Sequence, residues 1–262
     1  MTHIIACANS KGGVLKTTTA ATLAHKLALM DAGVIAIDAD PQGSLSMVLG
    51  LMPDNSFAAA IAGNLYIPQH ARGFDTLTGN DTTKMAINET AAHIAAGALT
   101  RADIAAHLRE LGHNYDYTVI DTPPSGILQE IAILAADTIV IPVVLDYLAL
   151  AGLGNMLRMI CALGAQHTRT IILPTMYIRS RESEYNLSLL HETYPGHVCT
   201  AVPYCTAARD AAANAQTIWE IKDARSNRSA TLAAMRQAYE ELAHWITRTD
   251  QDTDGALTDE TQ

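Results

Sequence analysis

Residues 9–18 contain the side chains best suited to chemistry in this chain. The stretch reads Asn-Ser-Lys-Gly-Gly-Val-Leu-Lys-Thr-Thr, between a short apolar run and a helical pattern. Glycines let backbone N–H groups surround a phosphate, and a helix N-terminus adds positive potential. Lys16 could bind β and γ phosphate oxygens, and the Thr17 hydroxyl could ligate Mg²⁺. The stretch predicts a phosphate-binding loop, although Ser10 and Leu15 stand where G-x-x-x-x-G-K-[ST] has glycine.

Two acidic segments follow later apolar runs. Asp38 and Asp40 lie in Ile-Asp-Ala-Asp-Pro-Gln-Gly, and Asp121 ends Tyr-Thr-Val-Ile-Asp. Ligands of open parallel sheets bind at the carboxyl ends of the strands, where a carboxylate can hold Mg²⁺. A lone Asp after a strand is more often a helix cap, and the two loop glycines alone could form a simple tight turn. Three phosphate-site elements in the correct order favour a nucleotide site.

Strands and helices, which must position these residues, are expected to alternate along the chain. Strands are expected at 3–8, 34–38, 117–121, 138–144, 170–174 and 198–202. These runs are apolar throughout, as in strands covered on both faces. Helices are expected at 17–31, from a Thr100/Asp103 capping box to Leu111, and at about 229–248. The alternation predicts an α/β fold with a doubly wound, mostly parallel sheet flanked by helices.

The composition indicates a globular protein with one domain. Hydrophobic residues make up 49% of the 262 residues and charged residues 17%, which excludes disordered and collagen-like chains. No run approaches the roughly 18 apolar residues of a membrane span, and the start lacks a signal-peptide pattern, so we expect a cytoplasmic protein. We expect a single domain over 1–249 and an acidic, disordered tail at 250–262. Residues 54–100 show no clear pattern.

The charge distribution is uneven. Net charge is −10, which disfavours a nucleic-acid partner, but the tail holds five of the 27 acidic residues and none of the 17 basic ones. Basic residues gather near the C-terminus at Arg209, Lys222, Arg225, Arg228 and Arg236. This basic stretch could bind DNA by counterion release, or it could be a solvated, salt-bridged face. The four cysteines and ten histidines show no metal-binding spacing.

Three motifs together resemble the ParA branch of the deviant Walker A ATPases, P-loop NTPases that also include MinD and the nitrogenase iron protein. They are Lys-Gly-Gly-x-x-Lys-Thr-Thr at 11–18, Asp-x-Asp-Pro-Gln at 38–42 and Asp-Thr-Pro-Pro at 121–124. Residues 142–153 and 202–211 are similar to further ParA stretches, so the resemblance covers about residues 3–248. Leu15 and Val144 depart from it, because many relatives have glycine and glutamine there.

The resemblance implies a role for each matching residue. Lys11 would reach across a dimer interface to the partner's ATP, Lys16 would bind the β and γ phosphates, and Asp40 would orient the attacking water. The implied nucleotide-binding residues are Lys11, Gly12, Gly13, Val14, Leu15, Lys16, Thr17, Thr18, Met176, Pro203 and Tyr204. Those implied near Mg²⁺ are Thr17, Asp40 and Asp121. The Met176 and Pro203-Tyr204 positions would lie near adenine.

The resemblance also implies a cycle. ATP and Mg²⁺ would close a sandwich homodimer, which would bind DNA non-specifically and associate with the nucleoid, and a ParB-like or other cargo adaptor would stimulate hydrolysis. One rival is a MinD-like membrane-cycling regulator, which ends in a basic amphipathic helix, whereas this chain ends in QDTDGALTDETQ. We therefore expect no membrane partner. The other rival, an iron–sulfur ATPase, needs paired cysteines that this chain does not offer.

Overall fold

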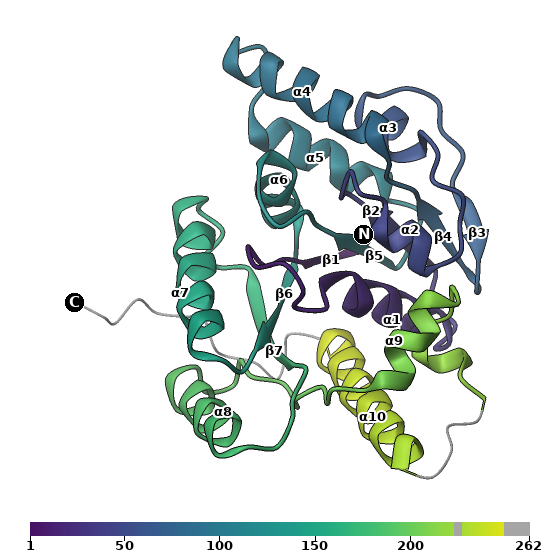
Figure 1. The fold of residues 1–262 in the computed structure, drawn as a ribbon. Coiled ribbons are helices and arrows are strands. Elements are labelled where there is room, and N and C mark those ends of the chain that lie inside the picture. Colours follow the sequence, from purple (N-terminus) through teal and green to yellow (C-terminus); the bar gives the residue numbers. More distant parts are fainter. Residues whose placement is uncertain (223–226, 249–262) are drawn as a thin grey trace.

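A computed structural model describes residues 1–222 and 227–248, and excludes the side chains of 147–149 and 227–228 (Figure 1). Within that part, seven strands form one sheet in the order β3-β4-β2-β5-β1-β6-β7. Their bounds are β1 (His3–Cys7), β2 (Val34–Asp38), β3 (Gln69–Ala71), β4 (Phe74–Leu77), β5 (Tyr117–Asp121), β6 (Thr138–Val144) and β7 (Arg169–Thr175). All neighbouring pairs are parallel except β3 and β4. The predicted mostly parallel, doubly wound sheet is confirmed.

Helices cover both faces of this sheet. They are α1 (Lys16–Ala28), α2 (Ser44–Val48), α3 (Ser56–Ile61), α4 (Asp81–Ala95), α5 (Arg101–Leu111), α6 (Ile127–Ala135), α7 (Tyr147–Ala162), α8 (Arg181–Thr193), α9 (Thr206–Ala213), the 3₁₀ turn η1 (Ile218–Glu220) and α10 (Asn227–Thr247). Successive strand residues point to opposite faces, so Ile4 and Ile5 enter different apolar cores. Strands buried on both faces need apolar residues at every position, which explains the uninterrupted apolar runs.

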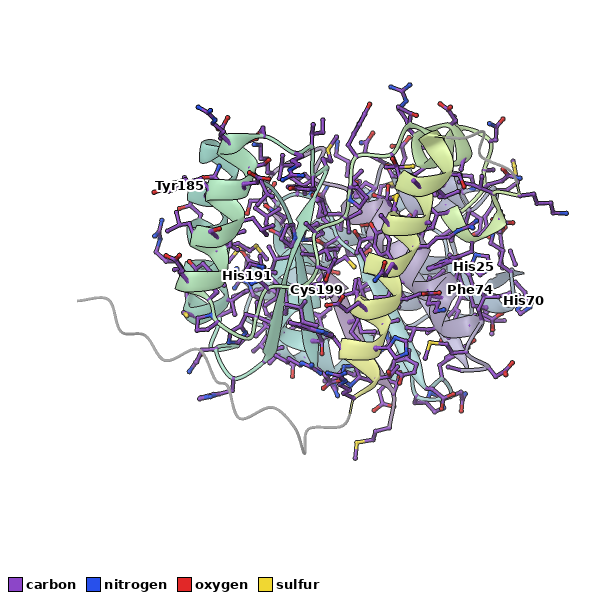
Figure 2. All side chains as sticks on the ribbon, turned by 90° about the horizontal axis from the view of Figure 1, so that it is seen from below. His25, His70, Phe74, Tyr185, His191 and Cys199 are labelled. Carbon is purple, nitrogen blue, oxygen red and sulfur yellow. The ribbon has the colours of Figure 1, made fainter. Side chains whose placement is uncertain are left out.

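Helix α10 packs against helix α1, which follows β1. Figure 2 shows α10 crossing one face of the molecule, between α8, which carries Tyr185 and His191, and the side that holds His25 and Phe74. A buried hydrogen bond of 3.1 Å joins the hydroxyls of Thr19 on α1 and Tyr239 on α10. The two ends of the described chain therefore share one core.

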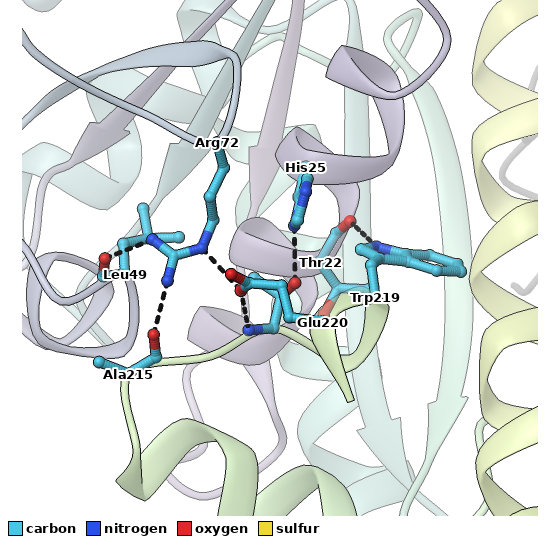
Figure 3. Close-up of polar contacts among 8 residues, drawn as sticks. Thr22, His25, Leu49, Arg72, Ala215, Trp219 and Glu220 are labelled. Atoms are coloured by element: carbon cyan, nitrogen blue, oxygen red, sulfur yellow. Dashed lines mark hydrogen bonds and ion pairs between the residues drawn. The ribbon is translucent and has the colours of Figure 1, made fainter. Parts of the chain in front are cut away.

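A half-buried arginine, Arg72, fixes the segment between α9 and α10. Arg72, in the turn between β3 and β4, donates to the Glu220 carboxylate at 2.7 Å and to the carbonyls of Leu49 and Ala215 at 2.5 Å each (Figure 3). Two further hydrogen bonds attach this segment to α1, His25 to Thr217 at 2.6 Å and Trp219 to the Thr22 carbonyl at 2.8 Å. The basic stretch is thus connected to the end of α2 and to α1.

Several predicted elements differ from the structure. The strand expected at 198–202 is reduced to two isolated bridges, Ile172 with Val198 and Tyr177 with Pro203. The helix expected at 17–31 ends at Ala28, because Asp31 adopts a left-handed conformation (φ 61°). The segment 54–100, which shows no clear sequence pattern, contains α3, β3, β4 and α4. The strand β3 is short and half-exposed, so it lacks the apolar run that would predict a strand. The Thr100 capping box of α5 is confirmed.

The described residues contain no helix that is both long and apolar enough to cross a membrane. All four cysteines are free, and Cys161 is the exposed one among them. The division into one domain and a tail stays a prediction, since residues 249–262 lie outside the description.

Candidate nucleotide-binding site

Three strands end together at the carboxyl edge of the sheet. In the strand registers, Asp121 at the end of β5 lies beside Cys7 of β1 on one side and beside Asp38 of β2 on the other. The loop that leaves Cys7 is therefore adjacent to Asp121, and Asp38 lies one strand further along the same edge. Such an edge, where neighbouring parallel strands lead into helices, is where ligands bind in open α/β sheets.

The loop from β1 to α1 is held open around an exposed centre. Asn9 anchors its start, donating from its side-chain amide to the Pro142 carbonyl at 2.6 Å and accepting the Lys11 N–H at 2.9 Å. Gly12 and Gly13 are exposed, with nothing within 4 Å of where a Cβ would lie. Their N–H groups can therefore approach a phosphate without obstruction, as a phosphate-binding loop requires.

Leu15 lies at the end of this loop in a left-handed conformation. Its φ of 68° and ψ of 27° are typical of glycine, and it immediately precedes α1. The backbone thus adopts the turn that glycine normally supplies in this motif, with a leucine in its place.

The Lys16 side chain points back into the loop. Its ammonium donates to the Lys11 carbonyl at 3.0 Å, and the residue is 8% exposed. Burial lowers the pKa of Lys16, while the charges of Asp121 and Asp40 raise it. A cation enclosed in this way is well placed to meet the phosphate oxygens of a bound nucleotide.

Asp121 is a buried carboxylate that its neighbours compensate only weakly. Neither of its oxygens accepts a well-formed hydrogen bond from the described residues. Burial and then the charge of Asp38 raise its pKa well above the usual range, and the Thr17 hydroxyl and the Lys16 ammonium oppose this less strongly. An orphan carboxylate is costly in a protein interior, and a cation bound beside it would offset that cost. Asp121 therefore fits a Mg²⁺ position.

The remaining acidic residue of the predicted metal set lies nearer the surface. Asp40 is partly exposed, and its Oδ1 accepts the Gln42 N–H at 2.9 Å. Within the described part of the chain, no three His, Cys, Asp or Glu side chains are grouped as a metal site. Mg²⁺ commonly takes one or two protein carboxylates together with substrate phosphates and water, so the arrangement suits a metal that arrives with a nucleotide.

Two segments predicted to lie near adenine are neighbours. The Tyr177 N–H donates to the Val202 carbonyl, and the Tyr204 N–H donates to the Tyr177 carbonyl, both at 3.0 Å. Met176 adopts a left-handed conformation (φ 54°) where the chain leaves β7. The preceding Thr175 hydroxyl donates to the Val14 carbonyl at 3.1 Å, which joins this region to the phosphate-binding loop. The structure brings these two segments together beside the phosphate-binding loop.

The basic stretch is only partly described. Arg209 and Lys222 are exposed, and Arg209 lies 3.9 Å from Asp210. Arg225 and the side chain of Arg228 lie outside the described residues. The half-buried Arg236 donates from its guanidinium to the carbonyls of Ile218 and Ile221, and its contact with DNA stays a prediction. Arg236 therefore supports the turn η1.

The sequence did not indicate two further residues that contact the predicted site residues. The Ser46 side chain and N–H hold Asp38, and Asp146 pairs with Lys11. Neither Ser46 nor Asp146 belongs to a motif with a fixed spacing. Their contacts depend on how α2 and the β6–α7 connection fold back on the loop.

Comparison with known proteins identifies the family. A family model described as an AAA domain matches residues 2–172. A ParA family protein of Chlamydia pneumoniae is 34% identical over 203 residues, covering 73% of this chain and 79% of that protein. The chain belongs to the ParA family. The chromosome partitioning protein ParA of Myxococcus xanthus is also 34% identical to this ParA-family chain, over 59% of the chain and just 56% of that protein.

Solved structures agree with this assignment. Apo McdA of Cyanothece superposes with a TM-score of 0.76 at 21% identity, covering 91% of this chain and 99% of that one. Cobyrinic acid a,c-diamide synthase of Mycobacterium smegmatis, with bound ATP analogue and magnesium, gives 0.73 at 26% identity, covering 94% and 97%. MinD of Pyrococcus horikoshii with Mg-ADP gives 0.72 at 19% identity, covering 95% and 97%. The family and the P-loop fold are confirmed, and the ligands of the last two structures agree with the predicted ATP and Mg²⁺.

Proposed function

We propose that this ParA-family chain is a Mg²⁺-dependent ATPase that positions a cargo. In this proposal ATP closes a sandwich homodimer, the dimer binds DNA non-specifically, and a ParB-like or other cargo adaptor stimulates hydrolysis. The observation that carries the proposal is the buried Asp121, whose carboxylate has no well-formed hydrogen bond and lies near the enclosed ammonium of Lys16. The charge of an Mg²⁺–nucleotide complex would compensate both groups.

Within one chain, the residues divide the work of phosphoryl transfer. Mg²⁺, when bound, neutralises charge on the phosphates. The Lys16 ammonium and the N–H groups of Gly12 and Gly13 bind phosphate oxygens, while Thr17 and Asp121 hold the metal. Asp40, partly exposed at the mouth of the site, orients the attacking water. No other carboxylate of the three motifs has this exposure, so turnover without a partner should be slow.

The position of Lys11 supports a dimeric site. Lys16 already occupies the loop of its own chain, whereas the Lys11 side chain is 38% exposed at the loop's mouth. It can therefore serve the phosphates of a facing subunit. DNA binding is supported by the exposed Arg209 and Lys222, and by relatives that carry partitioning names.

Complementation between two inactive variants tests the sandwich dimer. Lys11→Ala and Lys16→Ala proteins are mixed in equal amounts, and mixed dimers are confirmed by mass spectrometry. If Lys11 acts in the partner, half of the dimers are mixed and each has one complete site, which gives about a quarter of wild-type turnover when sites act independently. ATP trapped per mixed dimer is the second readout. Mixed dimers that trap no ATP would exclude the trans role of Lys11.

A further inference from the structure

We propose that Arg72 is a positioning residue that connects the nucleotide site to the basic stretch within one chain. Its guanidinium joins the C-terminal ends of α2 and α9, so a displacement of the Asp40 loop on ATP binding moves Arg209 on α9. The inference rests on the proposed DNA binding. It adds a route by which the nucleotide regulates that surface before a second subunit is present.

One guanidinium serves the C-terminal ends of two helices (Figure 3). Arg72 donates to the carbonyl of Leu49, the C-cap residue of α2, and to the carbonyl of Ala215, two residues beyond α9. The last carbonyls of a helix lack partners within the helix and carry partial negative charge, so a cation stabilises both ends. Because the Arg72 side chain is 15% exposed, neither end can move away without leaving a mostly buried donor unpaired.

The two helix ends are also in direct contact. A Cβ on Gly50 would lie 2.9 Å from the Cβ of Ala215, which is closer than van der Waals contact. Ala215 has a left-handed backbone (φ 54°), and so does Arg72 (φ 56°). This conformation is unfavourable for residues with a Cβ and persists where the surrounding contacts determine it. The ends of α2 and α9 therefore meet at a constrained junction, in which Gly50 leaves room for Ala215.

The other end of α2 is held at the nucleotide site. The helix begins at Ser44, directly after the loop that carries Asp40. Ser46 in its first turn donates two hydrogen bonds to Asp38, at 2.8 and 2.6 Å. With five residues, α2 is about 7.5 Å long. A displacement at Asp38 or Asp40 therefore reaches Arg72 through little more than one helical turn.

Exposed cations of the basic stretch lie on both sides of the residues that Arg72 holds. Arg209 is exposed on α9, and Lys222 is exposed just after η1. In η1, one oxygen of Glu220 accepts from the Arg72 Nε at 2.7 Å and from the Thr217 N–H at 2.8 Å. The guanidinium thus sets the places of α9 and η1, and with them the places of two exposed cations relative to the nucleotide site.

Helix α1 offers a second route to the same segment. It begins at Lys16, and it meets the segment through His25, bonded to Thr217, and through the Thr22 carbonyl, bonded to Trp219. These contacts lie about two turns beyond Lys16, on a helix that shares a core with α10. The route through α2 is shorter, because α2 directly follows the Asp40 loop. A change at the α2–α9 junction leaves the α1 contacts intact, so the two routes can be separated.

The first test disrupts the α2–α9 contact without changing Arg72. Gly50→Ala places a Cβ against Ala215. The swapped variant Gly50→Ala/Ala215→Gly removes the atom that this Cβ meets, and keeps one alanine and one glycine at the two left-handed positions. The measured quantity is the ratio of affinities for random-sequence DNA with ATP and with ADP. One residue on a coupling route changes such a ratio by about two- to thirtyfold, so the ratio should fall by that factor in Gly50→Ala and recover in the swapped variant.

Dimerisation of the same samples is measured by sedimentation, because two linked DNA-binding surfaces bind more tightly than one. The dissociation constant of the ATP-bound dimer should not differ between wild type and the variants. Ala215→Gly alone is the matched control: it keeps the carbonyl that Arg72 binds and should leave the ratio unchanged. An unchanged ratio in Gly50→Ala, a loss that the swapped variant does not restore, or a loss that weaker dimerisation accounts for would overturn the proposal.

The second test needs neither DNA nor a dimer. In a Trp245→Phe background, Trp219 in η1 is the remaining tryptophan, and its fluorescence reports the surroundings of that turn. At protein concentrations below dimerisation, a nonhydrolysable ATP analogue should change the Trp219 emission, and the change should be at least about twofold smaller after Gly50→Ala. Equal changes would assign the route to α1 and overturn the inference, as would no change in either protein. If the ATP-bound wild-type dimer binds no DNA, the proposed function fails, and that outcome is separate from the fluorescence result.

Discussion

Ser46 donates two hydrogen bonds to one carboxylate oxygen of Asp38, from its N–H at 2.8 Å and from its hydroxyl at 2.6 Å. The other oxygen of Asp38 has no partner among the described residues. Burial raises the pKa of Asp38 to about 6, and the two bonds from Ser46 oppose this shift. The junction between β2 and α2 therefore holds a carboxyl group that resists ionisation, next to Asp121 across the sheet.

Asp38→Asn should change how stability depends on pH in the nucleotide-free protein. The pKa of Asp38 rises from 3.8 to about 6 on folding, so its neutral form is favoured in the native state. Wild-type stability relative to Asp38→Asn should be greatest below pH 4 and should fall as the pH rises to about 6, by about 3 kcal/mol in all. Urea unfolding from pH 4 to 7.5 measures this. A stability difference that does not vary with pH would contradict the prediction.

Lys16→Ala and Asp40→Ala should fail at different steps. Removing the enclosed ammonium leaves the phosphate charges uncompensated, so Lys16→Ala should lose ATP-dependent dimerisation, measured by light scattering. Asp40→Ala should still bind ATP and dimerise, but its turnover should fall by at least about tenfold. Normal dimerisation of Lys16→Ala, or normal turnover of Asp40→Ala, would remove that residue from its proposed role.

Leu15→Gly should be more stable than Leu15→Ala. A residue with a Cβ pays about 1 to 2 kcal/mol in the left-handed conformation that Leu15 adopts, whereas glycine does not. Glycine gains more entropy on unfolding, so the net advantage over alanine should be about 0.5 to 1 kcal/mol. The alanine variant controls for loss of the leucine side chain. Equal unfolding free energies of the two variants would show that the loop backbone is not strained.

Arg72→Met should destabilise the protein by about 3 kcal/mol. The substitution leaves the Glu220 carboxylate and two carbonyls without their donor, and the Arg72 side chain is just 15% exposed. Adding Glu220→Gln should recover part of the loss, since the unpaired charge is then removed. Arg179→Met is the control: its side chain is 85% exposed, and the change should stay within about 0.5 kcal/mol. A similar loss in both arginine variants would contradict a specific role for Arg72.

The two exposed cations of the basic stretch should set the salt dependence of DNA binding. Each phosphate contact contributes about 0.9 to the slope of log affinity against log salt concentration. Arg209→Ala combined with Lys222→Ala should therefore reduce the slope for a dimer by up to about 4 on random-sequence DNA, measured by fluorescence anisotropy. An unchanged slope would assign these residues to a solvated face.

Much of the fold was predictable because its strands are buried on both faces. The runs at β1, β2, β5 and β6 are short, apolar and followed by the motif residues, so their order and the location of the site follow from the sequence. The placement of Lys11, Lys16 and Thr17 follows from the sequence because one loop sets their spacing, and their chemical roles stay predictions.

The rest depends on contacts between segments distant in sequence. β3 has three residues with little burial, and segment 198–202 pairs with its neighbours at isolated bridges, so neither shows a decisive local pattern. The sequence does not distinguish Arg236 from any other basic surface residue. Its partners, the carbonyls of Ile218 and Ile221, are brought to it by the fold of a separate segment. Asp146 lies 135 residues from Lys11, and no spacing rule connects them.

The contact between α1 and α10 has a consequence during synthesis on the ribosome. Thr19 and Tyr239 are 220 residues apart, so the apolar side of α1 is covered by a helix that is made 220 residues later. At about 5 to 20 residues per second, roughly 200 residues take about 10 to 40 s. The phosphate-binding loop and α1 therefore emerge well before α10, and a chain that has not yet reached α10 lacks the Tyr239 contact that covers α1.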